Sequence, residues 1–282
     1  MSSITAPRPV EQTRARYPDR EGLLDRGGVR IHWESYGAGE PAVLFLPTWS
    51  VVHSRVWKMQ IPDFARRHQV ITFDGRGNGG SDRPTESAAY LEDEFAADAL
   101  AVMDECRVDR AVVVGVSLGG QRGLILAGEH PERVAGLVLI APAVRVGVPR
   151  PPERTAPGPF DEDLGVDEGW ARYNAHSWRR DYPGFLQFFF EQVFTEPHST
   201  KAIEDCIGWA LETDPETLIT AEGATGMSEE RTRELCSRLR CPVLVMHGDE
   251  DAIIPHGFGE EVARITGGRL VTDPVTRVLD GA

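Results

Sequence analysis

The chain has little cysteine, and its few cysteines do not form a pattern. Among 282 residues there are 4 Cys, at positions 106, 206, 236 and 241. They are too few and too scattered for the disulfide framework of a small secreted protein. Cys236 and Cys241 have no second Cys or His pair near them in sequence, so we predict no metal site. Buried free thiols in a reducing cytoplasm are the expected state, which gives cytoplasmic localisation as an expectation.

Long apolar runs and basic stretches are also missing. No segment approaches the roughly 18 uninterrupted apolar residues that a membrane-spanning helix needs, so we expect no membrane partner. Lys and Arg together number 30 against 44 Asp and Glu, which gives a net charge of −14. An acidic surface repels phosphate backbones, so we expect no nucleic-acid partner. Residues 1–22 are polar, with several Pro and Arg and no apolar centre, and we expect a disordered leader there.

What the sequence does contain is a series of short apolar runs separated by helical patterns. Helical spacing of apolar residues covers 92–106 and 118–130. Strands alternating with helices predict an α/β fold, in which a mostly parallel sheet is flanked by helices. The runs expected to form strands are 29–36, 42–46, 70–73, 111–114, 137–140, 243–246 and 269–272.

The alternation stops after residue 141 and resumes near residue 242. The intervening segment is rich in aromatic residues and shows helical but not strand-like periodicity. We therefore expect a core domain formed by 23–145 and 239–282, with a helical cap inserted over 146–238. The aromatic residues could pack a fixed cap onto the sheet or belong to a mobile lid, and composition does not separate these alternatives.

One motif carries chemistry, namely Gly115-Val116-Ser117-Leu118-Gly119 between a buried strand and a helix. This is the G-x-S-x-G arrangement in the strand–turn–helix context that it requires. A serine at such a sharp turn projects its hydroxyl above the sheet, and the two glycines let strand and helix approach closely. The amide of Leu118 then faces the oxyanion that would form when Ser117 attacks a carbonyl.

The chain resembles the α/β-hydrolase superfamily, and three further segments carry the resemblance. Residues 44–49 correspond to that family's oxyanion loop, residues 73–81 to its D-x-R-G-x-G-x-S loop, and residues 245–255 to the strand end that bears the acid of the triad. Capped esterases and enol-lactonases are the most similar members. The resemblance implies Ser117 as nucleophile, Asp251 as acid, and the backbone amides of Trp49 and Leu118 as oxyanion donors.

A cofactor is not expected. Gly75, Gly77 and Gly80 satisfy G-x-G-x-x-G after a strand, which is typical of a dinucleotide-binding loop. A helix should then begin at once, but Ser81 to Pro84 favour turns and bar a helix. The glycines are better explained as allowing this loop to pack tightly near Ser117.

The family's catalytic histidine has no counterpart at the expected place. The base should follow the strand at 269–272, yet no His occurs after His256, as though a short segment were absent. Of the other histidines, His53 in the oxyanion loop and His176 in the cap are candidates for contact with substrate. Loss of the base in a serine hydrolase costs about a factor of 10⁶ in turnover.

Two functions therefore follow. The first is a serine hydrolase that acts on an ester, thioester or lactone carbonyl of a small apolar substrate, through an acyl-enzyme on Ser117. The alternative is a catalytically impaired protein of the hydrolase fold that binds a small ligand or a protein partner.

Overall fold

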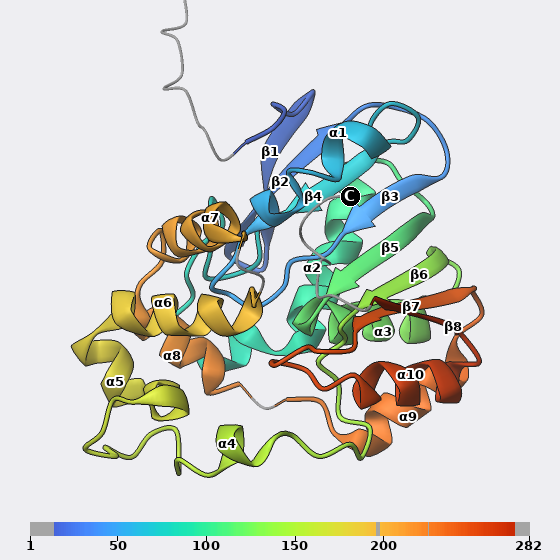
Figure 1. Ribbon diagram of the computed structural model, residues 1–282. Coiled ribbons are helices and arrows are strands. Elements are labelled where there is room, and N and C mark those ends of the chain that lie inside the picture. The colour runs from blue at the N-terminus through green and yellow to red at the C-terminus, as the bar shows by residue number, and fades with distance from the viewer. Residues whose placement is uncertain (1–13, 196–197, 225, 274–282) are drawn as a thin grey trace, which may run out of the picture.

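The computed structural model describes residues 14–195, 198–224 and 226–273. An eight-stranded sheet runs through it in the order β1-β2-β4-β3-β5-β6-β7-β8 (Figure 1). The pairs β1–β2 and β2–β4 are antiparallel, and all the other pairs are parallel. The strands are β1 Arg20–Arg26, β2 Val29–Tyr36, β3 Ala42–Phe45, β4 Val70–Phe73, β5 Ala111–Val116, β6 Val134–Ile140, β7 Val243–Gly248 and β8 Arg269–Asp273.

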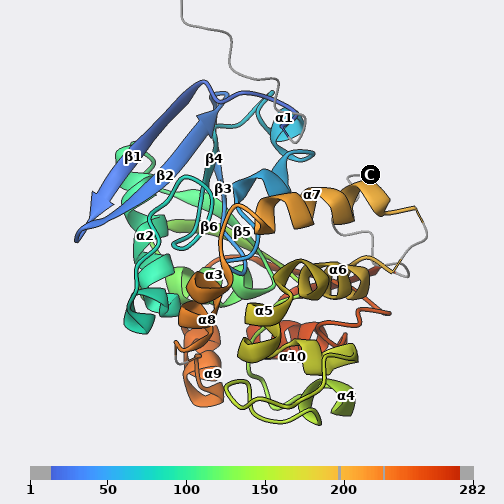
Figure 2. The ribbon, with the colours of Figure 1, turned by 90° about the vertical axis from the view of Figure 1, so that its left-hand side faces the viewer.

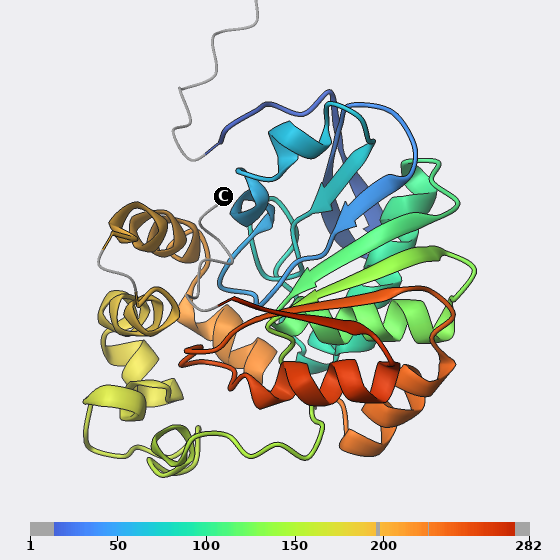
Figure 3. The same cartoon turned by 45° about the vertical axis from the view of Figure 1, so that its right-hand side comes forward.

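Helices cover the sheet on both faces, which confirms the predicted α/β fold. One core cluster joins the central strands to α2, α3 and α10, and a second joins the opposite face to α1 and the helical turn η1 Ser54–Trp57 (Figure 3). Burial of apolar residues on both faces explains why β3 and β4 read as continuous apolar runs. The helices outside the β6–β7 connection are α1 Ile61–Phe64, α2 Glu92–Glu105, α3 Leu118–Glu129 and α10 Gly257–Thr266, with the helical turn η2 Ser87–Tyr90 before α2.

The long connection between β6 and β7 is helical over much of its described length. Helices α4 to α8, called here the inserted helices, lie beside the sheet rather than on its faces (Figures 1 and 2). Helix α9 differs, because it packs against α3 and α10, so the core resumes before the expected boundary at 238. The elements are α4 Pro152–Thr155, η3 Gly169–Arg172, α5 Ala175–Arg180, α6 Tyr182–Val193, α7 Thr200–Ala210, α8 Pro215–Glu222 and α9 Glu229–Arg238.

The leader expected over residues 1–22 is wrong at its C-terminal end. Most of the leader expected over 1–22 lies outside the described residues, but residues 20–22 belong to β1. This strand pairs with β2 through a tight hairpin, in which Gly27 and Gly28 have φ of 65° and 87°. Two consecutive positive φ angles are what a two-residue hairpin requires, and Gly adopts them without strain. The strand is charged because it forms the edge of the sheet, which is why its composition resembles a leader.

The inserted helices are fastened to the core along α7 and the segment that follows it. Lys58 of the core pairs with Asp205 of α7. Beyond α7, Glu212 lies 3.2 Å from Arg55, and the Thr213 hydroxyl donates to the Gly77 carbonyl at 2.7 Å. No helix in the described part of the chain is long and apolar enough to span a membrane. The four cysteines are all free thiols, and three of them are buried.

Candidate active site

Ser117 occupies a strained turn between β5 and α3. Its backbone has φ 54° and ψ −118°, a conformation that L-residues rarely adopt. Neighbouring strands hold it there, since its amide donates to the Ile140 carbonyl at 2.9 Å and its carbonyl accepts from the Ala143 amide at 3.0 Å. The turn needs glycine at Gly115, where a Cβ would lie 2.2 Å from the Gly119 carbonyl oxygen. These contacts give the conformation that the G-x-S-x-G pattern predicts.

The loop after β3 passes directly over the start of α3. A Cβ on Gly119 would lie 3.1 Å from the Pro47 carbonyl oxygen, so loop and helix are in contact. The amides of Trp49 and Leu118 donate to no acceptor among the described residues. Two unpaired backbone donors beside a serine are the elements from which an oxyanion hole is built.

A buried arginine of α3 fixes this loop. The Arg122 side chain donates to the Pro47 carbonyl at 2.9 Å and also to the Thr48 carbonyl. Its Nε donates to Glu92 at 2.7 Å, and its guanidinium lies 3.6 Å from the centre of the Phe95 ring. This role was not predicted from the sequence, because a lone arginine in a helix has no local pattern.

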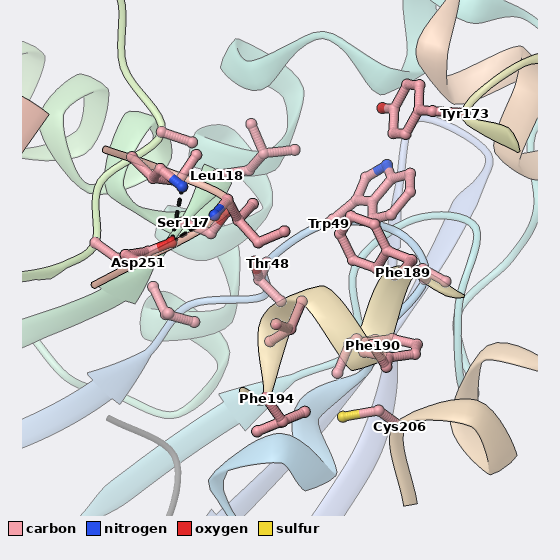
Figure 4. Close-up of a pocket in the computed structure, with 18 of the residues that line it drawn as sticks. Thr48, Trp49, Ser117, Leu118, Tyr173, Phe189, Phe190, Phe194, Cys206 and Asp251 are labelled. Carbon is pink, nitrogen blue, oxygen red and sulfur yellow. Dashed lines mark hydrogen bonds between the residues drawn. The ribbon is translucent and has the colours of Figure 1, made fainter. Parts of the chain in front are cut away.

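Asp251 follows β7 and faces the same cavity as Ser117. One of its carboxylate oxygens accepts from the amides of Ile253 and Ile254, both at 2.8 Å, as the dashed lines in Figure 4 show. Its other oxygen lies 3.6 Å from Nε2 of His247, which bonds to the Ile254 carbonyl at 2.7 Å. Asp251 is thus held rigidly at the position that the resemblance implies for the acid, whereas Asp249 lies outside the cavity lining.

The cavity between the core and the inserted helices has a volume of about 440 Å³. Ser117, Leu118 and Thr48 stand near Asp251, and aromatic side chains form the far wall (Figure 4). The Trp49 ring stacks on Tyr173 with centres 5.7 Å apart and meets the edge of Phe189 at 5.0 Å. The remaining lining residues are Val51, Val52, Val56, Val116, Ala141, Ala143, Arg150, Arg154, Trp170, Phe190, Val193, Phe194, Cys206, Glu222, Ile253 and Ile254.

Glu222 is a polar group in this wall that the sequence did not reveal. Its carboxylate accepts a hydrogen bond from the Trp49 indole at 2.9 Å and another from the Tyr173 hydroxyl. Burial raises the pKa of Glu222, and these two hydrogen bonds oppose the rise only in part. Residues 49, 173 and 222 are far apart in sequence, so only the fold brings them together.

The two histidines expected near the substrate are elsewhere. His53 is buried behind the loop, with Nε2 3.5 Å from Glu212 and its ring against Trp209. His176 lies on α5 and bonds to the Asp161 carbonyl at 3.1 Å. Neither lines the cavity.

His256 bonds to the Thr272 hydroxyl at 2.9 Å, facing β8. None of the eight histidines, all of which are in the described part of the chain, lines the cavity.

The glycine-rich loop after β4 packs against the oxyanion loop. Asp74 accepts from the amides of Ser54 and Gly80, at 3.0 and 2.8 Å, and Asn78 donates to the Ser50 carbonyl at 2.7 Å. A Cβ on Gly75 would lie 3.1 Å from Pro47. The glycines of this loop therefore allow close packing.

One group of three possible metal ligands exists among the described residues, made of Glu21, His32 and Glu34. It lies on the β1–β2 hairpin and outside the cavity lining. Its members have protein partners, because Glu34 pairs with Arg14 at 2.7 Å and His32 bonds to Asp74 at 3.2 Å. The group therefore suggests no role in the chemistry at Ser117.

Comparison with known proteins gives the family. The family model described as the alpha/beta hydrolase fold matches residues 41–274. 3-Oxoadipate enol-lactonase 2 of Acinetobacter baylyi is 26% identical over 246 residues, which cover 82% of this chain and 80% of that protein.

Solved structures show the same relationship. Est816, described as an N-acyl homoserine lactone degrading enzyme, superposes with a TM-score of 0.73 at 26% identity, over 92% of this chain and 95% of that one. An esterase from Exiguobacterium antarcticum has the same fold, with a TM-score of 0.70 at 23% identity over 87% of each chain. The match over most of the length, together with the strand order and the turn at Ser117, shows that this chain belongs to the α/β-hydrolase family.

Proposed function

We propose that the protein is a serine hydrolase that acts on an ester, thioester or lactone carbonyl through an acyl-enzyme on Ser117. The observation that carries the proposal is the strained backbone of Ser117 at the wall of an apolar cavity, with two unpaired amides beside it. Relatives named as an esterase and as an enol-lactonase support the same class of reaction.

In the first step Ser117 Oγ forms a bond to the carbonyl carbon. The carbonyl oxygen becomes an oxyanion, which the amides of Trp49 and Leu118 stabilise together with the positive end of α3. The tetrahedral intermediate then breaks the bond to the leaving oxygen or sulfur. The hydroxyl proton of Ser117 passes through solvent to the leaving group. A water molecule later attacks the carbonyl carbon of the acyl-enzyme, the bond from that carbon to Ser117 Oγ breaks, and Oγ takes up a proton from the water as the acid is released.

The absence of a histidine from the cavity lining determines which substrates can react. Without a positioned base, the leaving group must depart with little help from proton transfer. Activated acyl compounds, such as aryl esters and thioesters, therefore react faster than alkyl esters. In the family the acid at this position orients a histidine. No histidine of the described residues lines the cavity here, and Asp251 accepts hydrogen bonds from two backbone amides.

A fluorophosphonate probe tests the nucleophile directly, because it labels only an activated serine. We expect labelling of the wild-type protein and none of Ser117→Ala. Ser237→Ala is the matched control, since Ser237 is an exposed serine on α9 far from the cavity lining. No labelling of the wild type, or equal labelling of Ser117→Ala, would refute the proposal.

The second candidate is a protein of this fold that binds a ligand without turnover. The observation that favours it is the same lack of a histidine at the cavity. Intact mass after incubation with an aryl ester separates the two functions. An added acyl group that Ser117→Ala lacks supports the hydrolase. Equal ligand stabilisation of wild type and Ser117→Ala, with no added mass, supports the binding protein.

The same proposal includes a role for the inserted helices and a compartment. Helices α5 to α8 act as a cap that closes the cavity over Ser117, because Tyr173, Phe189 and Glu222 complete its walls. The free thiols suit a reducing cytoplasm, where a small-molecule substrate would be met.

A further inference from the structure

Two arginines lie at the cavity and play no part in the chemistry described above. Both line it near the start of the inserted segment, Arg150 just before α4 and Arg154 within α4. The guanidinium of Arg154 lies 4.5 Å from the centre of the Trp170 ring and donates to the Ile253 carbonyl. The cavity thus carries two arginines beside the two acidic residues Asp251 and Glu222, and the rest of its walls is mostly apolar.

Among the residues that the structure describes, neither arginine forms an ion pair within 4.0 Å with Asp or Glu. Asp251 and Glu222 are the acidic side chains of the lining, and both carboxylates already accept hydrogen bonds from other groups of the protein. Burial lowers the pKa of Arg154, and the neighbouring charge of Arg150 lowers it further. The carboxylates of Asp251 and Glu222 oppose this lowering.

Resting on the proposed function of Ser117, we propose that Arg150 and Arg154 bind a carboxylate of the substrate, at a distance from the carbonyl that is attacked. An incoming carboxylate would relieve the repulsion between the two arginines, and guanidinium groups match its geometry with paired hydrogen bonds. The substrate class is then an ester, thioester or lactone that bears a second, ionised carboxyl group. The apolar spacer between its two ends would lie along Trp49 and Trp170.

Binding to Ser117→Ala tests this inference without turnover. Calorimetry would compare monoethyl esters of dicarboxylic acids of increasing chain length with the corresponding diethyl esters, which lack the charge. We expect the best monoethyl ester to bind more tightly than its diethyl ester. Because hydrogen bonds to charged groups contribute about 1.5–3 kcal/mol, the Arg150→Gln/Arg154→Gln pair should weaken the monoethyl ester about 10- to 100-fold. The double variant should change the affinity for the diethyl ester by less than about twofold.

Two further variants keep the result interpretable. Arg145→Gln is the matched control, because Arg145 is an exposed arginine of the same segment that does not line the cavity. Arg154→Lys keeps the charge but loses the forked hydrogen-bond geometry, and it should retain part of the preference for the monoethyl ester. This variant tests the inference even where the double variant disturbs the fold. Equal affinity of both ester types, or equal loss for both in the double variant, would overturn the carboxylate site. Failure of fluorophosphonate labelling with the preference intact would instead overturn Ser117 as nucleophile.

Discussion

Replacement of Arg122 by methionine would remove the hydrogen bonds that hold the loop after β3 to helix α3. Methionine keeps an unbranched apolar stem of similar length but removes the charge and every donor. The Pro47 and Thr48 carbonyls would lose their donor from α3, and the carboxylate of Glu92 would lose its partner at 2.7 Å. Arg122 is 2% exposed in its side chain, so water does not replace these interactions.

The expected cost follows from the groups left unpaired. A buried carbonyl without a donor costs about 1–3 kcal/mol, and breaking a buried ion pair costs about 3–5 kcal/mol. These contributions overlap, so we expect the free energy of unfolding to fall by about 3–5 kcal/mol in total. Fluorophosphonate labelling should slow about 10- to 100-fold. The full loss of an oxyanion donor costs about 10²–10³-fold, but Asn78 still holds the Ser50 carbonyl.

Urea denaturation and the labelling rate would be measured on the same preparations. Arg122→Lys keeps the charge without the fork, and it should lie between wild type and Arg122→Met in both assays. Adding Glu92→Gln to Arg122→Met should recover part of the stability but none of the labelling rate. A loss below about 1 kcal/mol together with an unchanged labelling rate would refute the supporting role.

Two glycines and one histidine give the remaining predictions. Gly115→Ala should abolish labelling and destabilise the protein by more than about 1–3 kcal/mol, because its Cβ would meet the Gly119 oxygen at 2.2 Å. Gly208→Ala on α7 meets nothing within 4 Å and should stabilise by about 0.5–1 kcal/mol in urea; destabilisation there would contradict the packing described. The hydrogen bond to Asp74 raises the pKa of His32 above its usual value of about 6.5. This stabilisation is complete below that value and is lost as pH rises through the raised pKa, so the wild type should lose more stability than His32→Gln between weakly acidic and alkaline pH. Parallel pH profiles of the two proteins would show that the pair contributes nothing.

The fold could be predicted because its strands are buried on both faces. Such strands are continuous apolar runs, and the runs at 42–46, 70–73 and 243–246 each overlap an observed strand. Strand β1 was missed because a charged edge strand lacks that signal. Helix α9 was assigned to the cap because its amphipathic pattern does not say which surface it covers, and it covers α3.

The candidate site divides in the same way. Ser117 lies in a local sequence pattern that dictates a turn, whereas Asp251 was predicted only from the resemblance to the family. Both side chains line one cavity. Glu222, Arg150 and Arg154 depend on contacts between segments far apart in the chain, and no spacing indicates them. The expectation for His53 and His176 followed from their segments alone, whereas their side chains turn to Glu212 and Asp161.

The attachment of α7 has a consequence for how molecules reach the cavity. Asp205 and Thr213 tie this side of the inserted helices to the core. We therefore expect this side to stay in place when a substrate enters. We then expect substrate to enter from the opposite side, near α4. A substrate that enters there would contact Arg150 and Arg154 before it reaches Ser117. Selection by charge would then occur before any contact with the nucleophile.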